Sequence, residues 1–75
     1  STKHLRNIPL KINRDFLSEQ GCVCNRKNGG HEHWSIKDLL RPITIQTHVD
    51  PVPEFIIKNG LRQLGVSKKF FLDWI

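Results

Sequence analysis

The sequence predicts an α+β fold in the order α-β-β-β-α, with a three-stranded antiparallel sheet, helices on one face of it and a short C-terminal helix. Apolar residues recur at helical spacing near both ends of the chain, whereas strand-like alternation occurs only in the middle. An Asn-Gly pair also joins two strand-like runs, which is a strong signal for a β-hairpin. A chain of 75 residues can enclose only one apolar core, so residues 1–75 are expected to form a single domain.

The first helix is predicted to begin near Pro9 and to end at Gly21. Proline is tolerated in the first turn of a helix but not in its interior, and glycine is common just after the last helical residue. Apolar residues recur at helical spacing at Leu5, Ile8, Ile12 and Phe16, but because Pro9 cannot stand inside a helix, only Ile12 and Phe16 fall within the predicted helix.

A hairpin is predicted from the runs CVCNRK and HEHWSI, which are separated by Asn28, Gly29 and Gly30. A two-residue turn at Asn28 and Gly29 would place Cys24 opposite His33. The later run ITIQTH alternates apolar and polar residues, as a half-buried strand does, and is predicted to be the third strand.

Side-chain alternation then assigns the residues of the hairpin to two faces. The apolar face is expected to pack against the helices and carries Val23, Trp34 and Ile36. The other face is expected to be exposed to solvent and carries Cys22, Cys24, Arg26, His31, His33 and Ser35. The third strand would add its polar residues to this exposed face: Thr44, Gln46 and His48.

The main helix is predicted within DPVPEFIIKNGLRQLG, with Asp50 as its N-cap, Pro51 in its first turn and Gly65 at its end. Gly60 in its interior costs up to about 1 kcal/mol relative to alanine, which suggests that the helix packs closely on a strand or a partner there. Ser67 is predicted to cap a short terminal helix whose aromatic residues gather on one side: Phe70, Phe71 and Trp74.

The charge of the chain favours a polyanionic partner such as nucleic acid, because 12 Lys and Arg residues against 7 Asp and Glu residues give a net charge of +5. No apolar run approaches the roughly 20 residues of a membrane-spanning helix, so no membrane partner is expected. The C-x-C spacing of Cys22 and Cys24 does not suit a disulfide, and no signal-peptide pattern is visible. These features predict a reduced, cytoplasmic location.

Two histidines directly after the turn, His31 and His33, suggest acid–base chemistry on the exposed face. An unperturbed imidazole has a pKa of about 6.5, so it takes and gives protons at neutral pH. Such a ring would remove the proton from a ribose 2′-hydroxyl, whose oxygen then attacks the adjacent phosphorus without a metal. His48 is a further candidate proton carrier, and the side chains expected to hold the phosphate are Arg26, Lys27 and Arg41.

Other interpretations of these residues remain open. His31 and His33 are also compatible with solvated strand residues on a non-catalytic RNA-binding module, and His48 with a cap or turn residue. Cysteines and histidines on adjacent strands would offer the ligands of a zinc-stabilised interaction domain. However, a C-x-C pair along a flat strand separates its thiolates by about 7 Å, whereas zinc sites usually space their cysteines on a turn.

Four segments together resemble a known family. DFLSEQGC leads from a helix into a strand, and LRQLGVSKKFF spans a closing helix and the turn after it. KNGGHEHW resembles a Gly-Ser-His hairpin, and ITIQTHVDP a strand that ends in a histidine. The combination, which covers nearly the whole chain from about Asn13 onward, resembles the HicA toxins, small messenger-RNA interferases with a double-stranded-RNA-binding-domain-like fold.

The resemblance implies a ribosome-independent endoribonuclease that cleaves messenger RNA by histidine acid–base catalysis, with no metal or other cofactor. His31 falls at the position of the family's catalytic histidine, and Gly30 replaces the serine that precedes it. The implied protein partner is a HicB-type antitoxin that masks His31 and the basic surface. Operator DNA would be bound only through the complex of toxin and antitoxin.

Overall fold

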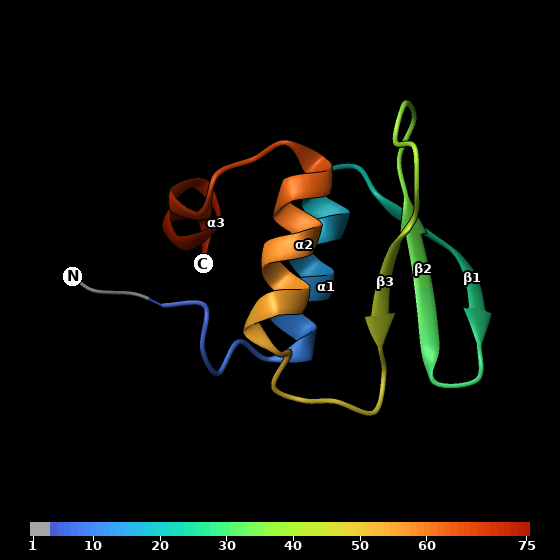
Figure 1. Ribbon diagram of the computed structural model, residues 1–75, viewed down its shortest axis with the longest axis horizontal. Helices are drawn as coiled ribbons and strands as arrows, with labels where there is room; N and C mark the ends of the chain where they lie inside the picture. The colour runs from blue at the N-terminus through green and yellow to red at the C-terminus, as the bar shows by residue number, and fades with distance from the viewer. Residues whose placement is uncertain (1–3) are drawn as a thin grey trace.

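Residues 4–75, which the computed structural model describes, form three helices and three strands in the predicted order. The elements are α1 (Leu10–Glu19), β1 (Val23–Asn28), β2 (His31–Ser35), β3 (Ile43–Gln46), α2 (Glu54–Leu64) and α3 (Lys68–Trp74). The strands make one antiparallel sheet in the order β1-β2-β3, which confirms the predicted α+β class (Figure 1). None of the helices in this part of the chain has the length and apolar character needed to cross a membrane.

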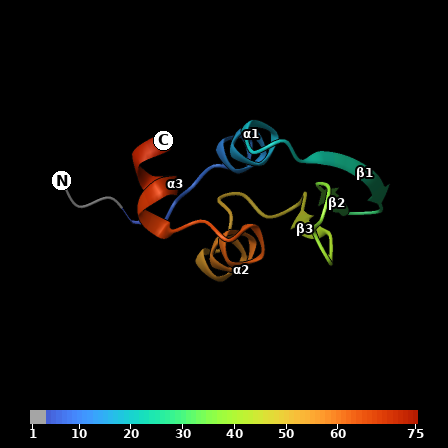
Figure 2. The ribbon, with the colours of Figure 1, turned by 90° about the horizontal axis from the view of Figure 1, so that it is seen from above.

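The helices lie on one side of the sheet, as predicted. Figures 1 and 2 show α1 and α2 side by side against the sheet, with α3 on the far side of this helix pair. The core lies between the layers, because each amphipathic element turns its apolar side inward. Its most deeply buried members include Phe16 of α1, Ile45 of β3, Ile57 of α2 and Phe71 of α3. The opposite face of the sheet is covered by no helix of residues 4–75.

Asp50 caps the first helix and not the second, so the prediction for this residue was wrong. Its Oδ1 accepts a hydrogen bond of 3.0 Å from the backbone N–H of Leu10, at the start of α1. The second helix begins only at Glu54, with Pro53 at its N-cap position, and Pro51 lies before it. The residue before a proline avoids helical backbone angles. Val52 precedes Pro53, so α2 cannot begin before Pro53.

The C-terminal half of α2 and the start of α3 agree with the sequence prediction. Gly65 follows α2 with a left-handed φ of 74°, which glycine adopts without steric cost. The Ser67 side chain accepts a hydrogen bond of 3.0 Å from the N–H of Phe70 and caps α3. Gly60 is buried where α2 packs on β3, and a Cβ at this position would lie 3.6 Å from Cγ2 of Ile43. That distance is an ordinary contact, so the packing predicted here exists but does not require glycine.

Three aromatic rings surround Phe16 and attach α3 to α1. The ring centroids of Phe71 and Trp74 lie 4.7 Å and 5.2 Å from that of Phe16, both in edge-to-face geometry. Phe70 is more distant, at 6.1 Å, and its side chain is about half exposed. Such pairs prefer edge-to-face contact because the positive ring edge meets the negative ring face. The predicted aromatic side of α3 therefore closes the core at its end distant from the sheet.

Candidate nucleic-acid interface

The hairpin turns at Gly29 and Gly30, one residue later than predicted. Asn28 pairs with His31 and Arg26 with His33, so the predicted pairing of Cys24 with His33 is wrong. The strand register then shifts between Cys24 and Arg26, where β1 contains one extra residue. An extra residue of this kind, a β-bulge, exchanges the faces of the residues before it.

The bulge moves both Cys24 and Val23 to the faces opposite those predicted. Cys24 pairs with Trp34 and shares its helix-facing side, whereas Val23 pairs with Ser35 and is 59% exposed. The extra residue is Asn25, whose side-chain amide donates to the hydroxyl oxygen of Ser35. This side-chain bond links the bulged residue of β1 to β2.

Apart from Cys22 and Cys24, the β1, β2 and β3 residues predicted for the exposed face lie on the side that the helices leave uncovered. The register places His31 opposite Gln46 and His33 opposite Thr44. The hydroxyl oxygen of Thr44 lies 3.3 Å from Nδ1 of His33, a hydrogen bond that orients this ring. We call this uncovered side of the sheet the outer face; it carries Arg26, His31, His33, Ser35, Thr44 and Gln46.

His31 is exposed at the first position of β2, and His48 lies near it at the same end of the sheet. The N–H of Thr47 donates to the carbonyl oxygen of Gly30 over 2.7 Å, which holds the segment after β3 against the hairpin turn. The His48 ring occupies the space where a Cβ at position 30 would stand. Glycine at position 30 therefore admits the His48 ring, which a larger residue would have to displace.

Lys27 and Arg41 are not brought to His31. Lys27 pairs with Glu32 on the helix-facing side, and its ammonium nitrogen lies 3.8 Å from Oε2 of that carboxylate. Arg41 precedes β3 in the loop that follows β2, whereas His31 lies by the hairpin turn at the other end of the sheet (Figure 1). Of the three predicted phosphate contacts, Arg26 alone belongs to the outer face.

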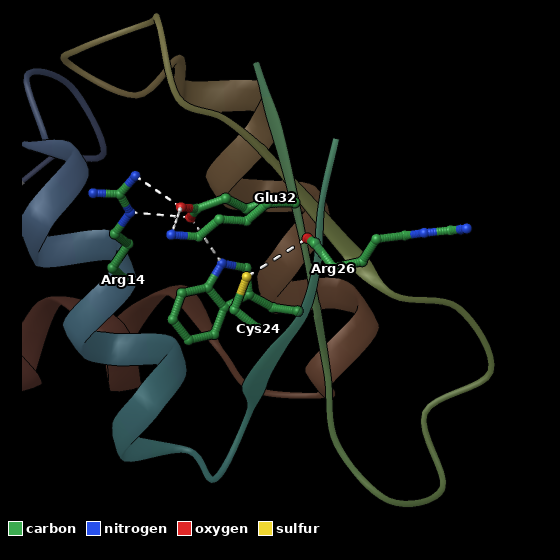
Figure 3. Close-up of polar contacts among 6 residues, drawn as sticks. Arg14, Cys24, Arg26 and Glu32 are labelled. Carbon is green, nitrogen blue, oxygen red and sulfur yellow. Dashed lines mark hydrogen bonds and ion pairs between the residues drawn. The ribbon is translucent and has the colours of Figure 1, made fainter. Parts of the chain in front are cut away.

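A partly buried ion pair that the sequence did not predict joins Arg14 of α1 to Glu32 of β2. The Glu32 residue is only 4% exposed, and its two carboxylate oxygens accept bonds of 3.1 Å each from Nε and Nη2 of Arg14. Nε1 of Trp34 donates to the same carboxylate over 3.2 Å. Figure 3 shows Arg14 and Glu32 together on the helix side of the sheet and the side chain of Arg26 extending away from them.

Alternation in the sequence contained a signal for this pair. Glu32 stands between His31 and His33, so exposure of both histidines places its carboxylate against the helices. A carboxylate there is costly without a cationic partner. Arg14 supplies that partner, and the pair fixes which side of β2 faces α1 and therefore which side presents the histidines.

The cysteines and histidines of the hairpin do not converge on a metal site. Cys22 is buried in the core, so its predicted place on the exposed face was wrong, and Cys24 faces the helices, whereas His31 and His33 belong to the outer face. Within residues 4–75, no three His, Cys, Asp or Glu side chains are grouped as metal ligands would be. Burial also raises the pKa of the Cys22 thiol above its usual value, which opposes formation of a thiolate.

Comparisons with protein-family models, curated proteins and solved structures found no match to this chain. The resemblance to the HicA toxins therefore rests on the four sequence segments described above. The geometry of the outer face provides a separate basis for a functional proposal.

Proposed function

We propose that this protein is an endoribonuclease of the HicA type, the toxin of a type II toxin–antitoxin system, which cleaves messenger RNA without a metal. One observation carries the proposal: His31, the histidine that the motif resemblance assigns to catalysis, is exposed on the outer face with Arg26 and His33. An imidazole open to solvent beside a cationic side chain is accessible to a ribose and its phosphate.

In the proposed reaction, His31 accepts the proton of a ribose 2′-hydroxyl. The 2′-oxygen attacks the adjacent phosphorus, and the bond from phosphorus to the 5′-oxygen of the next nucleotide breaks. A second acid protonates that leaving oxygen, which gives one 2′,3′-cyclic phosphate end and one 5′-hydroxyl end. His33 and His48 are the candidate acids, since His33 shares the face of His31 and His48 lies at the same end of the sheet.

The proposed roles of the cationic residues follow their positions. Arg26 is directly opposite His33, so its guanidinium is the nearest candidate to offset the charge that develops on the phosphate oxygens. Arg41 at the far end of β3 would contact a phosphate further along the RNA. Lys27 would have to break its ion pair with Glu32 to contact a phosphate, which makes it the weakest of the three candidate phosphate contacts.

The proposal is tested by incubating a structured RNA with wild-type protein in EDTA and comparing His31→Ala. We expect the variant to lose cleavage by at least about a hundredfold, the usual contribution of a general acid or base. A 2′-deoxy substitution at the cleaved nucleotide should abolish the reaction, because it removes the nucleophile. His4→Ala, an exposed histidine outside the sheet, serves as the matched control and should retain full activity.

Two outcomes would reject this site. Cleavage that persists in His31→Ala would exclude His31 as the acid or base, and cleavage that EDTA abolishes would exclude a metal-free mechanism. Salt-dependent binding of RNA that is never cleaved would instead assign a non-catalytic RNA-binding module, for which the same outer face suffices. Variants His33→Ala and His48→Ala then identify the second acid. Loss of this acid should slow the cleavage of an RNA with a poor leaving group more than that of an RNA with a good one.

The proposal includes a HicB-type antitoxin as the protein partner and the cytoplasm as the location. Such a partner would cover His31 and the outer face, and operator DNA would be bound through the complex. Expression of the wild-type protein should slow growth and that of His31→Ala should not, and co-expression with a cognate antitoxin should relieve the effect of the wild type.

A further inference from the structure

A groove of about 420 Å³ runs between the free edge of β3 and α2 and borders the outer face at Thr44. Its sheet side includes Ile43 and Thr44, and its helix side includes Ile56 and Gly60. Figure 1 shows why it exists: β3 is an edge strand of the sheet and runs alongside α2. A strand edge beside a helix is a geometry in which an extended peptide can add to a sheet.

The backbone groups on this edge of β3 are unpaired among residues 4–75. In an antiparallel pair, every second residue directs its backbone N–H and C=O groups toward the partner strand. The N–H of Thr47 donates to the carbonyl oxygen of Gly30, which identifies Thr47 as one of these residues. Ile43 and Ile45 therefore direct their N–H and C=O groups toward β2, whereas Thr44 and Gln46 direct theirs to the free edge, where Thr44 lines the groove. An unpaired edge of this kind is a template for another strand.

The other edge of the sheet is protected. β1 contains the bulge at Asn25, and Arg26 and Lys27 follow it directly. Bulges and charged residues are the usual means by which proteins prevent strand addition at an edge. β3 has neither feature within its bounds of Ile43–Gln46, so this edge is less protected than that of β1. Directly before β3, Gln63 Nε2 donates to the carbonyl oxygens of Arg41 and Pro42 over 3.2 Å and 3.4 Å.

The charge of the groove selects the partner. Arg41 and Arg62 line it, none of its lining residues is acidic, and neither arginine forms an ion pair with a residue in the described part of the chain. A second copy of this chain would bring the same two arginines to the same edge, and its net charge of +5 adds to that repulsion. An acidic partner satisfies both guanidinium groups.

We propose that an extended acidic segment of another protein adds to β3 as a fourth strand. Its backbone would pair with Thr44 and Gln46, an apolar side chain would pack on Ile56, and a carboxylate would meet Arg41 and Arg62. RNA fits less well, because no aromatic ring lines the groove to stack a base and the strand edge would remain unpaired. This interaction does not depend on ribonuclease activity.

The test uses a blocked peptide of alternating glutamate and valine, titrated into the isotope-labelled protein and followed by NMR. We expect the amides of Thr44 and Gln46 to shift most, while those of Val23 and Cys24 on the other edge stay unchanged. Arg62→Ala should weaken binding by about threefold to fivefold, as for an exposed ion pair, whereas Arg26→Ala should leave it unchanged. Methylation of the peptide nitrogens that face β3 should weaken binding by about tenfold or more, because it removes the donors of the strand pairing.

Several results would overturn the proposal. These are shifts centred on Arg26 and His33, equal binding of the methylated peptide, or equal binding of a peptide with lysine in place of glutamate. A short single-stranded RNA that shifts Thr44 and Gln46 and is weakened by Arg62→Ala, with no peptide binding, would assign the groove to nucleic acid instead. Each of these results can arise whether or not the protein cleaves RNA, so failure of this proposal is distinct from failure of the ribonuclease proposal.

Discussion

The guanidinium of Arg14 and the carboxylate of Glu32 join α1 to the central strand of the sheet through two hydrogen bonds of 3.1 Å each. Because Glu32 lies between His31 and His33, this contact on the helix side turns both histidines toward the outer face. The pair thus connects the packing of the protein to its proposed chemistry. It also accounts for a charged residue at a core position of β2.

Removal of Arg14 should destabilise the protein, because it leaves the Glu32 carboxylate buried without its main partner. We expect Arg14→Ala to lower the free energy of unfolding by about 1–3 kcal/mol. A fully buried pair would lose more, but the side chain of Arg14 is 37% exposed and water can reach the pair. Urea denaturation of the variant and the wild type provides the measurement.

The exposed pair of Lys11 and Asp15 is the matched control for this experiment, since its atoms are 3.4 Å apart and both side chains are solvated. Lys11→Ala should cost no more than about 0.5 kcal/mol. A double variant, Arg14→Leu with Glu32→Leu, should recover part of the stability, because apolar replacement of both partners leaves no buried charge unpaired. Equal losses for Arg14→Ala and Lys11→Ala would show that the partly buried pair contributes no more to stability than an exposed pair does.

Gly60→Ala should stabilise the protein by up to about 1 kcal/mol, since alanine is the better helix former. The new methyl group would make an ordinary contact with Ile43 at 3.6 Å, beside a residual space of about 10 Å³ under α2. Gly65→Ala is the control and should destabilise the protein by about 1 kcal/mol, because its φ of 74° is unfavourable for a residue with a Cβ. Thermal denaturation measures both, and a loss of stability in Gly60→Ala would indicate that β3 cannot accept the methyl group.

Asp50→Ala should weaken the start of α1, although residue 50 lies 40 positions away from Leu10 in sequence. Loss of an N-cap side chain typically costs about 0.5–2 kcal/mol. Asp50→Asn keeps an oxygen acceptor and should retain most of that stability. Hydrogen exchange at the Leu10 amide reports the effect directly, and unchanged protection in Asp50→Ala would mean that this bond does not hold the helix end.

The buried thiol of Cys22 should make stability depend on alkaline pH. Burial raises its pKa in the folded state above the ordinary value of 9.0, so the unfolded chain releases this proton first as the pH rises. The stabilising contribution is complete below the ordinary pKa and is lost as the pH rises through the raised, folded-state pKa. Between about pH 8 and pH 10, wild-type protein should lose more unfolding free energy than Cys22→Ala does. Parallel losses in the two proteins would argue against a titrating Cys22.

Local sequence determined most of the secondary structure. Gly65 and Ser67 mark a helix end and a helix start because each acts through its own backbone angle or a neighbour three residues away. Alternation along β2 and β3 likewise identified the histidines and Thr44 as outer residues, since a strand turns successive side chains to opposite faces. These features require no knowledge of distant contacts.

Tertiary structure alone decided which distant residues meet. The Asp50 side chain has an acceptor that suits either helix start, and only the packing of its loop against α1 places it at Leu10. The bulge at Asn25 reverses the faces of Cys24 and Val23, because a register depends on both paired strands and not on one. The pairing of Arg14 with Glu32 and the groove between β3 and α2 arise in the same way, from surfaces that come together only when the helices cover the sheet.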